Sequence, residues 1–180
     1  MTFPATMLGF ISSGDQRLMR RVNRWKPPRW IRFWMILATR AGDGWLWYAI
    51  GVLVLAFGGP SRFAAVAAAG ISCGVGAALF LVLKRLAGRK RPCAIASHCW
   101  ATLLPPDQFS FPSGHTITAF AIALSLGRIY PQGEPALLLT AACIGASRVL
   151  LGMHFLSDVL VGAIFGAGIG YGSFLLFTGL

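Results

Sequence analysis

Acidic residues are scarce in this chain of 180 residues, which has 5 Asp and Glu against 16 Lys and Arg and a formal net charge of +11. Charged residues of both signs make up only 12% of the chain, whereas soluble domains average about 25%. Hydrophobic residues make up 56% and form long apolar runs. This composition argues against a soluble domain and indicates one membrane domain. The excess of positive charge suits an anionic partner.

Other features are also missing. The chain has no cluster of acidic residues that would bind a metal ion, no internal repeat and no low-complexity tract. Its first residues lack a basic segment followed by a long apolar core, so we expect no cleavable signal peptide. The basic residues flank apolar runs, which argues against nucleic acid as the partner. Cys93 and Cys99 are six apart in a polar segment, and this spacing allows a disulfide in an oxidising compartment.

The N-terminal part of the chain is basic and amphipathic. Residues 15–26 carry arginines between Leu18, Val22 and Trp25, which recur at helical spacing, so this segment is expected to be an interfacial amphipathic helix. After a Pro-Pro break, residues 29–41 are rich in Trp and Ile but also contain arginines, which favours an interfacial or half-inserted segment. We therefore expect residues 1–42 to form a basic interfacial region.

The rest of the chain, residues 43–180, is expected to be a transmembrane domain. Five apolar runs predict membrane-spanning helices, at residues 43–59, 62–83, 114–127, 135–147 and 154–178. The fold class is thus all-α, a polytopic transmembrane helical bundle with five spans, or six if residues 29–41 cross with their flanks. Gly162, Gly166 and Gly170 repeat every four residues, so they line one helix face suited to close packing.

This layout brings distant polar residues to one face of the membrane. The loop 84–113, the turn 148–153 and the start of the last helix share a face, because the chain crosses twice between the loop and the turn. His154 and Asp158 are four residues apart, so a carboxylate can accept the Nδ1–H of an imidazole and leave Nε2 as a nucleophile or base.

A phosphate site is predicted on the same face. Lys84, Arg91 and Arg148 can converge there from three segments, and His115 follows Ser113-Gly114 at the start of a helix, where backbone N–H groups favour anions. Two histidines beside such a site supply a nucleophile and an acid for the leaving group.

These residues resemble a known signature. The pattern is similar to the three-part motif of the type 2 phosphatidic acid phosphatase (PAP2) superfamily, and it reads Lys84-x6-Arg91-Pro92, Pro112-Ser113-Gly114-His115 and Ser147-Arg148-x5-His154-x3-Asp158. All three parts are present in order, with no departure at a signature position. The resemblance identifies residues 43–180 as a membrane phosphatase domain.

The resemblance also implies a role for each residue. His154 would attack phosphorus and form a phosphohistidine, Asp158 would orient His154, and His115 would protonate the leaving oxygen and then activate water. Five residues would hold the phosphoryl oxygens, Gly114 through its backbone N–H: Lys84, Arg91, Ser113, Gly114 and Arg148. Neither a metal nor another cofactor is expected. Arg85, Arg89 and Lys90 match no signature position and are expected to be interfacial anchors or to attract an anionic head group.

The orientation implied by the resemblance conflicts with the distribution of charge. The family places its active site on the outer face, which is periplasmic in a bacterial inner membrane. If residues 29–41 do not cross, the active-site face also carries eight earlier basic residues, while the opposite loops carry only Arg62 and Arg128. The positive-inside rule would make that face cytoplasmic. We expect an outward-facing site, because chemistry rather than orientation explains the phosphate-site cations.

The expected function is hydrolysis of a phosphorylated lipid in the membrane. Candidate substrates are undecaprenyl diphosphate, phosphatidylglycerol phosphate and phosphatidic acid, with the polyprenyl diphosphate placed first. One alternative is a lipid A phosphatase or phosphotransferase, in which an acceptor other than water takes the phosphoryl group. Another is an inactive lipid-binding membrane protein, which predicts a damaged signature.

Overall fold

The computed structural model describes residues 5–95 and 108–179, and the regular elements among them are helical. The helices are α1 (Ala5–Arg24), α2 (Arg29–Ala41), α3 (Trp45–Phe57), the 3-10 turn η1 (Gly59–Ser61), α4 (Arg62–Ala87), α5 (Pro92–Ile95), α6 (Gly114–Ile129), α7 (Glu134–Leu150) and α8 (Leu156–Thr178). The all-α expectation is confirmed.

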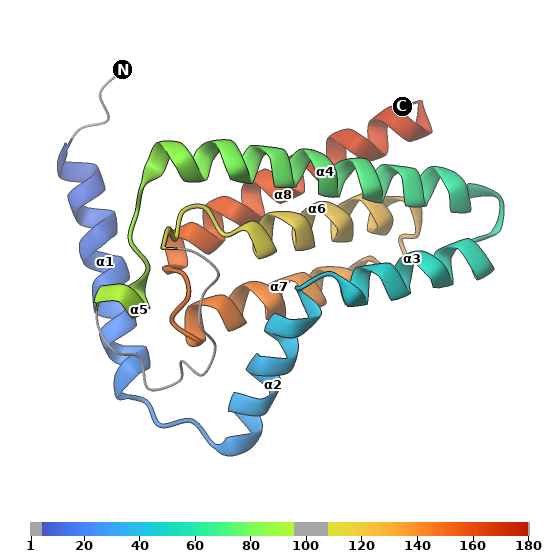
Figure 1. Cartoon of the computed structure of the whole chain (residues 1–180). Coiled ribbons are helices and arrows are strands. Elements are labelled where there is room, and N and C mark those ends of the chain that lie inside the picture. Colours follow the sequence, from blue (N-terminus) through green and yellow to red (C-terminus); the bar gives the residue numbers. More distant parts are fainter. Residues whose placement is uncertain (1–4, 96–107, 180) are drawn as a thin grey trace.

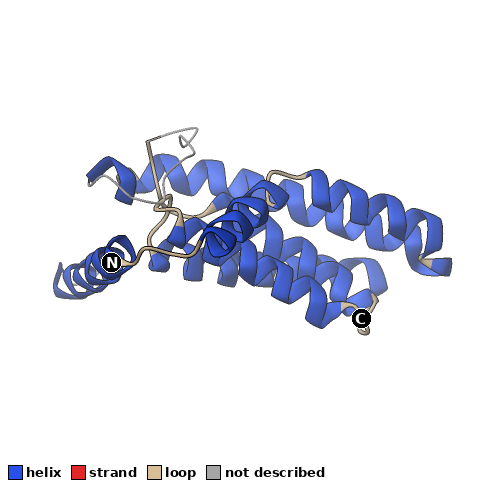
Figure 2. Cartoon of the chain, turned by 90° about the horizontal axis from the view of Figure 1, so that it is seen from below, coloured by secondary structure: helices blue, strands red, loops and turns tan. Residues whose placement is uncertain are grey.

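Five helices form the bundle, and two lie across one end of it. Figure 1 shows α3, α4, α6, α7 and α8 running side by side, with α1 and α2 oriented crosswise at the end where α8 begins. The view from below shows the same arrangement (Figure 2). Helix α6 packs against α4, α7 and α8, and its side chains Ile117, Ile122 and Leu126 are buried. The core of the bundle therefore surrounds α6.

Small residues allow α8 to approach α6 closely. Gly162, Gly166 and Gly170 are buried, and each lies against the backbone of α6 or of the residue before it. A Cβ atom at Gly166 would overlap the carbonyl oxygen of Ile117, and one at Gly170 would overlap that of Ala121. The expected glycine face of the last helix is confirmed.

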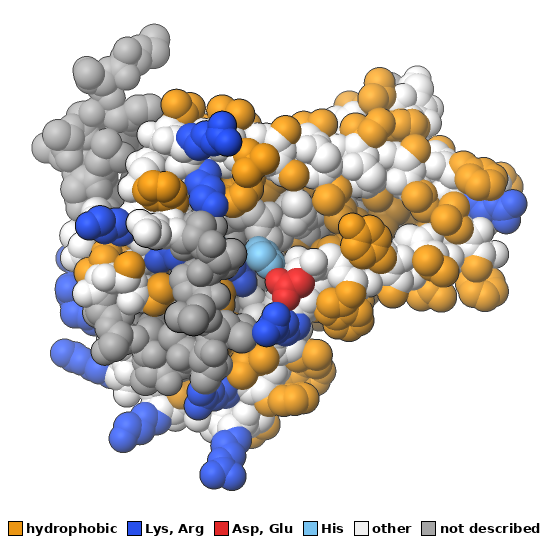
Figure 3. Space-filling model, viewed as in Figure 1, with side chains coloured by type: hydrophobic (Ala, Val, Ile, Leu, Met, Phe, Trp, Pro, Cys, Tyr) orange, Lys and Arg blue, Asp and Glu red, His pale blue; other side chains and the backbone are white. Residues whose placement is uncertain are grey.

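The surface of the bundle is that of a transmembrane protein. The continuous helix from Gly59 to Ala87 and helix α8 are each long and apolar enough to cross a membrane, and α3 is a shorter apolar helix. Figure 3 shows hydrophobic side chains over the flank of the bundle, whereas most Lys and Arg side chains gather at the end that carries α1 and α2. Charge at one end and apolar flanks suit a bundle embedded in lipid.

Helix α2 does not run along the bundle. It has the expected bounds, and its 13 residues extend about 20 Å, less than a hydrocarbon core of about 30 Å. Its exposed aromatic side chains include Trp30, Phe33 and Trp34, while it packs against α7. Its crosswise direction favours the five-span arrangement and an interfacial position for this helix.

Helix α1 is longer than expected and ends earlier, because it spans Ala5–Arg24 rather than residues 15–26. Asp15, Met19 and Val22 are buried on its inner face, and Met19 packs against Phe155 and Val159 at the start of α8. Its outward face carries exposed arginines. The helix therefore packs against the N-terminal end of α8, and its basic face points outward.

Candidate active site

A cavity of about 300 Å³ lies at the end of the bundle beside the turn between α2 and α3. Its wall is built by the α2–α3 turn, α4, α6, α7 and the segments before α5 and α8. The lining residues are Gly42, Asp43, Ala77, Phe80, Arg91, Gly114, His115, Thr118, Arg148 and His154. The cavity thus brings together both expected catalytic histidines and two of the three expected phosphate-binding cations.

His154 lies in the turn before α8, not within the helix that was expected to begin at residue 154. Gly152 has φ +70°, a conformation that reverses the chain after α7. The backbone N–H groups of Met153 and His154 then both donate to the carbonyl oxygen of Arg148, at 3.0 and 3.1 Å. This turn fixes the imidazole of His154 in the cavity wall with only 2% of the residue exposed.

The hydrogen bonds of His154 define its tautomer. Its Nδ1 lies 2.5 Å from the carbonyl oxygen of Ser110, and its Nε2 lies 3.0 Å from Nη1 of Arg91. A carbonyl oxygen only accepts and a guanidinium only donates, so Nδ1 carries the proton and Nε2 has a lone pair. Burial and the positive charges of Arg148 and Arg91 hold the pKa of His154 well below its usual range. The ring is neutral and suited to act as a nucleophile.

Asp158 supports this turn in a different way from the one expected. Its Oδ2 lies 3.9 Å from Nδ1 of His154, so the carbonyl of Ser110, not this carboxylate, accepts the Nδ1–H. Oδ2 instead accepts the backbone N–H of Phe155 at 2.8 Å, and Oδ1 accepts from Arg89 at 2.6 Å. The difference arises because His154 precedes the helix. Asp158 caps the helix and holds the backbone beside the imidazole.

Arg89 takes part in the hydrogen bonds of Asp158, whereas the sequence had suggested an interfacial position for it. Its guanidinium bridges Asp158 and Asp15 of α1, with Nη2 of Arg89 2.7 Å from Oδ2 of Asp15. The hydroxyl of Ser157 also donates to Asp15, at 2.5 Å. Both carboxylates are buried, so each needs the shared cation. Sequence reasoning missed this network, although Asp15 is one of only five acidic residues in the chain.

Two arginines supply positive charge to the cavity. Arg148 is 4% exposed, and its Nη1 donates to Oγ1 of Thr39 on α2 at 2.6 Å. Arg91 is 2% exposed and donates through Nη1 to the carbonyl oxygen of Met153 at 2.9 Å. Since both guanidiniums are held by the protein, they are preorganised for an anion.

His115 stands in the first turn of α6, on the cavity wall. Its Nε2 lies 2.9 Å from Oδ1 of Asp43, in the turn between α2 and α3. Gly114 also lines the cavity and begins α6, where backbone N–H groups lack helical partners. Ser113 is buried beneath it, and its hydroxyl accepts a hydrogen bond from Thr116 at 2.8 Å. The contact with Asp43 had not been expected.

Two other expectations fare differently. Lys84 is not one of the residues that line the cavity, and its ammonium lies 5.0 Å from the ring centroid of Phe80, which does line it. Its role in phosphate binding stays a prediction. Cys99 lies outside the described residues, so its pairing with Cys93 also stays a prediction. Within residues 5–95 and 108–179, no three His, Cys, Asp or Glu side chains gather as metal ligands would.

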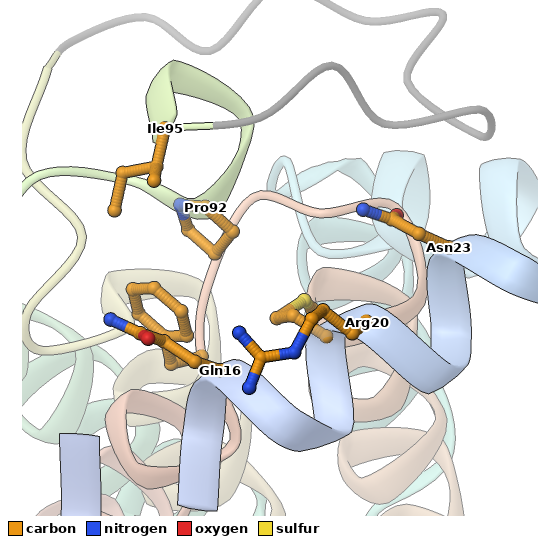
Figure 4. Close-up of a pocket in the computed structure, with 7 residues that line it drawn as sticks. Gln16, Arg20, Asn23, Pro92 and Ile95 are labelled. Carbon is orange, nitrogen blue, oxygen red and sulfur yellow. The ribbon is translucent and has the colours of Figure 1, made fainter. Parts of the chain in front are cut away.

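A smaller cavity of about 140 Å³ lies between α1 and α5, next to Phe155. Figure 4 shows Gln16, Arg20 and Asn23 of α1 facing Pro92 and Ile95 of α5. None of the expected site residues lines it, so it is separate from the cavity that holds the histidines.

The helical membrane bundle and its cationic, histidine-lined cavity define a membrane phosphatase. Comparison with known proteins gives the family: the sequence model of the PAP2 superfamily matches residues 63–179, and the chain belongs to that superfamily.

Individual relatives agree with this assignment. The chain is 38% identical over 129 residues to a decaprenylphosphoryl-5-phosphoribose phosphatase of Mycobacterium tuberculosis, covering 68% of this chain and 70% of that protein. It is 34% identical over 90 residues to a lipid A 1-phosphatase of Rhizobium johnstonii, covering 48% of this chain but only 37% of that protein.

Two solved structures share the fold. LpxE of Aquifex aeolicus has a TM-score of 0.72 and 27% identity, with 88% of this chain and 93% of that chain covered. The first transmembrane PAP2 type phosphatidylglycerolphosphate phosphatase of Bacillus subtilis has a TM-score of 0.69 and 26% identity, with 94% and 85% covered. The fold is thus that of membrane PAP2 phosphatases.

Proposed function

We propose that this phosphatase hydrolyses a phosphomonoester or diphosphate of a membrane lipid through a phosphohistidine on Nε2 of His154. The observation that carries the proposal is the state of that imidazole. The carbonyl of Ser110 holds the proton on Nδ1, and Arg91 and Arg148 place positive charge beside the unprotonated Nε2. A neutral nucleophile among fixed cations suits attack on a phosphoryl group.

The first chemical step would transfer the phosphoryl group to the enzyme. Nε2 of His154 forms a bond to phosphorus while the bond to the lipid oxygen breaks, and protonated His115 gives its proton to that oxygen. Arg91 and Arg148 hold the phosphoryl oxygens, with the backbone N–H of Gly114 on the same wall. In this assignment Asp158 holds the backbone beside His154, and the carbonyl of Ser110 accepts the Nδ1–H.

The second step would release inorganic phosphate. Neutral His115 takes a proton from water as the water oxygen attacks phosphorus, and the bond between phosphorus and Nε2 of His154 breaks. His115 is then protonated for the next cycle. No metal takes part in either step of this proposal.

Polyprenyl-linked phosphates are the first substrate class to examine. The mycobacterial relative that covers about two thirds of this chain is named for a decaprenylphosphoryl group joined to a 5-phosphoribose. This supports the lipid type expected first, with undecaprenyl diphosphate and a polyprenyl-linked phosphosugar as its two candidate members. Phosphatidylglycerol phosphate and phosphatidic acid remain in the candidate set, the former supported by the name of the Bacillus subtilis structure.

A lipid A substrate is the second candidate. Relatives named lipid A 1-phosphatase and the structural similarity to LpxE favour it. If an acceptor other than water captured the phosphohistidine, the enzyme would be a phosphotransferase. The two reactions differ in product, because transfer yields a phosphorylated acceptor in place of inorganic phosphate.

The decisive experiment is a phosphate-release panel over purified lipid phosphates, with His154→Ala as the matched variant. We expect wild type to turn over at least one lipid of the panel. The substitution should lower that rate by at least about 10³-fold, because it removes the nucleophile. EDTA should leave the wild-type rate unchanged. Full activity in His154→Ala would refute the phosphohistidine, and loss of activity in EDTA would refute metal independence.

We also propose that residues 1–42 lie in the interface and that the active site faces the periplasm of a bacterial inner membrane. The family resemblance supports this orientation, and the excess of basic residues at the same end opposes it. The C-terminus of α8 lies at the end of the bundle far from α1 (Figure 1). A C-terminal green fluorescent protein should therefore fluoresce in the cytoplasm, whereas activity of a C-terminal alkaline phosphatase fusion would reverse the assignment.

A further inference from the structure

The turn between α2 and α3 is shaped to bring a carboxylate against His115. Oδ1 of Asp43 lies 2.9 Å from Nε2 of the imidazole, although 72 residues separate the two in sequence. Gly44 has φ +118°, a backbone conformation that side chains disfavour, and it lets the chain enter α3 directly after Asp43. The Gly-Asp-Gly sequence is therefore suited to this turn.

The close approach of this turn also orients the imidazole ring. A Cβ atom at Gly42 would lie 3.0 Å from Cδ2 of His115 and 2.9 Å from Cγ2 of Ile144. The edge of the ring that carries Nε2 and Cδ2 thus faces the turn. The opposite edge, with Nδ1, points away from Asp43, and Nδ1 is the atom left for proton exchange in the cavity.

The carboxylate of Asp43 offsets the positive charges around His115. Arg148 of α7 and Arg91 of the segment before α5 place positive charge on the same cavity wall. His154 of the segment before α8 is neutral, and α4 contributes the uncharged Ala77 and Phe80. Positive neighbours oppose protonation of an imidazole. Asp43 is the acidic residue on the cavity wall, so it offsets them at the ring that must carry a proton.

We propose that Asp43 is a positioning residue for proton transfer by His115. This inference rests on the proposed function. Asp43 accepts the Nε2–H and stabilises the imidazolium before the reaction. His115 then gives its Nδ1 proton to the leaving oxygen as the phosphorus–oxygen bond breaks. In the second step the Nδ1 of neutral His115 takes a proton from the attacking water, while Asp43 still holds Nε2.

Arg40 completes the arrangement from α2. Its Nη1 lies 3.4 Å from Oδ2 of Asp43, the oxygen that does not contact His115. The Arg40 side chain is 59% exposed, so this ion pair orients the carboxylate more than it neutralises it. The order Arg40, Asp43, His115 therefore links the interfacial helix α2 to the proton donor.

The test compares two leaving groups in the full-length enzyme. For a lipid phosphate with a poor alkoxide leaving group, Asp43→Asn should lower kcat/KM by about 10- to 100-fold, part of the 10²- to 10⁴-fold that a positioned proton donor contributes. For p-nitrophenyl phosphate, whose leaving group needs no protonation, kcat/KM should change by less than about threefold. Because kcat/KM reports only the steps up to formation of the phosphohistidine, slow hydrolysis of that intermediate does not obscure the comparison.

Two further variants and a control make the result decisive. Asp43→Ala should show the same selectivity with a larger loss, and Asp43→Glu, which keeps the charge but moves the carboxylate, should be intermediate. Glu134→Gln removes an acidic charge that pairs with Arg128 and should retain wild-type kcat/KM for both substrates. In Asp43→Asn the basic limb of the pH–rate profile for the lipid should move to lower pH, because the imidazolium loses its carboxylate.

The outcomes separate this inference from the function on which it rests. Equal losses for both substrates, or no loss for either, with wild type fully active would overturn the role of Asp43 alone. Wild type that hydrolyses no phosphate ester would overturn the proposed function itself. A variant that unfolds is recognised by its melting curve. If Asp43→Asn unfolds, the role of Asp43, whose side chain is half-exposed, is judged from the kcat/KM values of Asp43→Glu.

Discussion

In the proposed reaction, the contact between Arg91 and His154 would have to change before the first chemical step. The guanidinium donates to Nε2, so the lone pair that would attack phosphorus is occupied before substrate arrives. A phosphoryl oxygen carries more negative charge than a neutral imidazole and is the stronger acceptor. Binding of the phosphate would therefore draw Arg91 away from the ring. The residue that holds the substrate would also release the nucleophile.

The pKa of His154 gives a prediction for pH dependence. This pKa lies below the ordinary value of about 6.5, so between these two values the unfolded chain binds a proton that the folded chain does not. The stability associated with neutral His154 is fully present above pH 6.5 and is lost as pH falls toward the folded-state pKa. We expect the melting temperature of wild type to fall more steeply below pH 6.5 than that of His154→Asn. Parallel curves for the two proteins would contradict this prediction.

At the scale of the element, the packing of α8 on α6 supports the whole site. The carbonyl oxygen of Asp158 accepts the backbone N–H of Ser113, at 3.2 Å, where α8 meets the start of α6. Further along α8, Gly166 and Gly170 bring the two helix backbones together. The separation of these helices thus sets the distance between the segment of His154 and the segment of His115.

This packing predicts different effects for glycines on opposite faces of α8. Gly166→Ala and Gly170→Ala should lower the melting temperature and the activity, because each Cβ would meet α6 backbone. Gly168→Ala is the matched control, since nothing lies within 4 Å of its Cβ position. It should leave activity unchanged and stabilise the helix by roughly 0.5–1 kcal/mol. Equal effects at positions 166 and 168, measured by activity and thermal melting in detergent, would refute the packing role.

The sequence predicted the elements and the signature residues, but not the contacts between them. Apolar runs located the five bundle helices, and motif spacing placed His115 and His154 at one cavity. The acceptor for His154 was missed because it is a backbone carbonyl, which carries no sequence signal. Asp15 and Asp43 were missed because their partners lie 142 and 72 residues away. Those contacts depend on the directions of α1 and α2, which the sequence does not show. Asp43 stands between two glycines, and this turn sequence was a signal that could have pointed to it.

At the scale of the whole molecule, the N-terminal helix is tied to the catalytic end of the bundle. Arg89 joins Asp15 of α1 to Asp158 of α8, and its guanidinium also lies 4.2 Å from the ring centroid of Phe155. A helix with a basic outer face therefore shares a cation with the carboxylate beside His154.

Removal of that cation should be costly. Arg89→Gln leaves two buried carboxylates without the cation they share. Asp15 keeps the hydroxyl and backbone N–H of Ser157, and Asp158 keeps the backbone N–H of Phe155. We expect activity to fall roughly 10- to 100-fold and the melting temperature to drop. Asp15→Asn should be milder, because Arg89 keeps Asp158. Exposed Arg85 provides the control, and Arg85→Gln should behave as wild type in both measurements. An Arg89→Gln enzyme with wild-type activity would show that the network is not needed.

The crosswise helices α1 and α2 bear on how much of the chain a functional fragment needs. The similarity to the superfamily covers residues 63–179, whereas Asp15, Thr39 and Asp43 all precede it. A gene trimmed to those borders would still encode every signature residue. Arg89, Arg148 and His115 would nevertheless each have lost a neighbour, so we expect the shortest competent fragment to be longer than the shortest recognisable one.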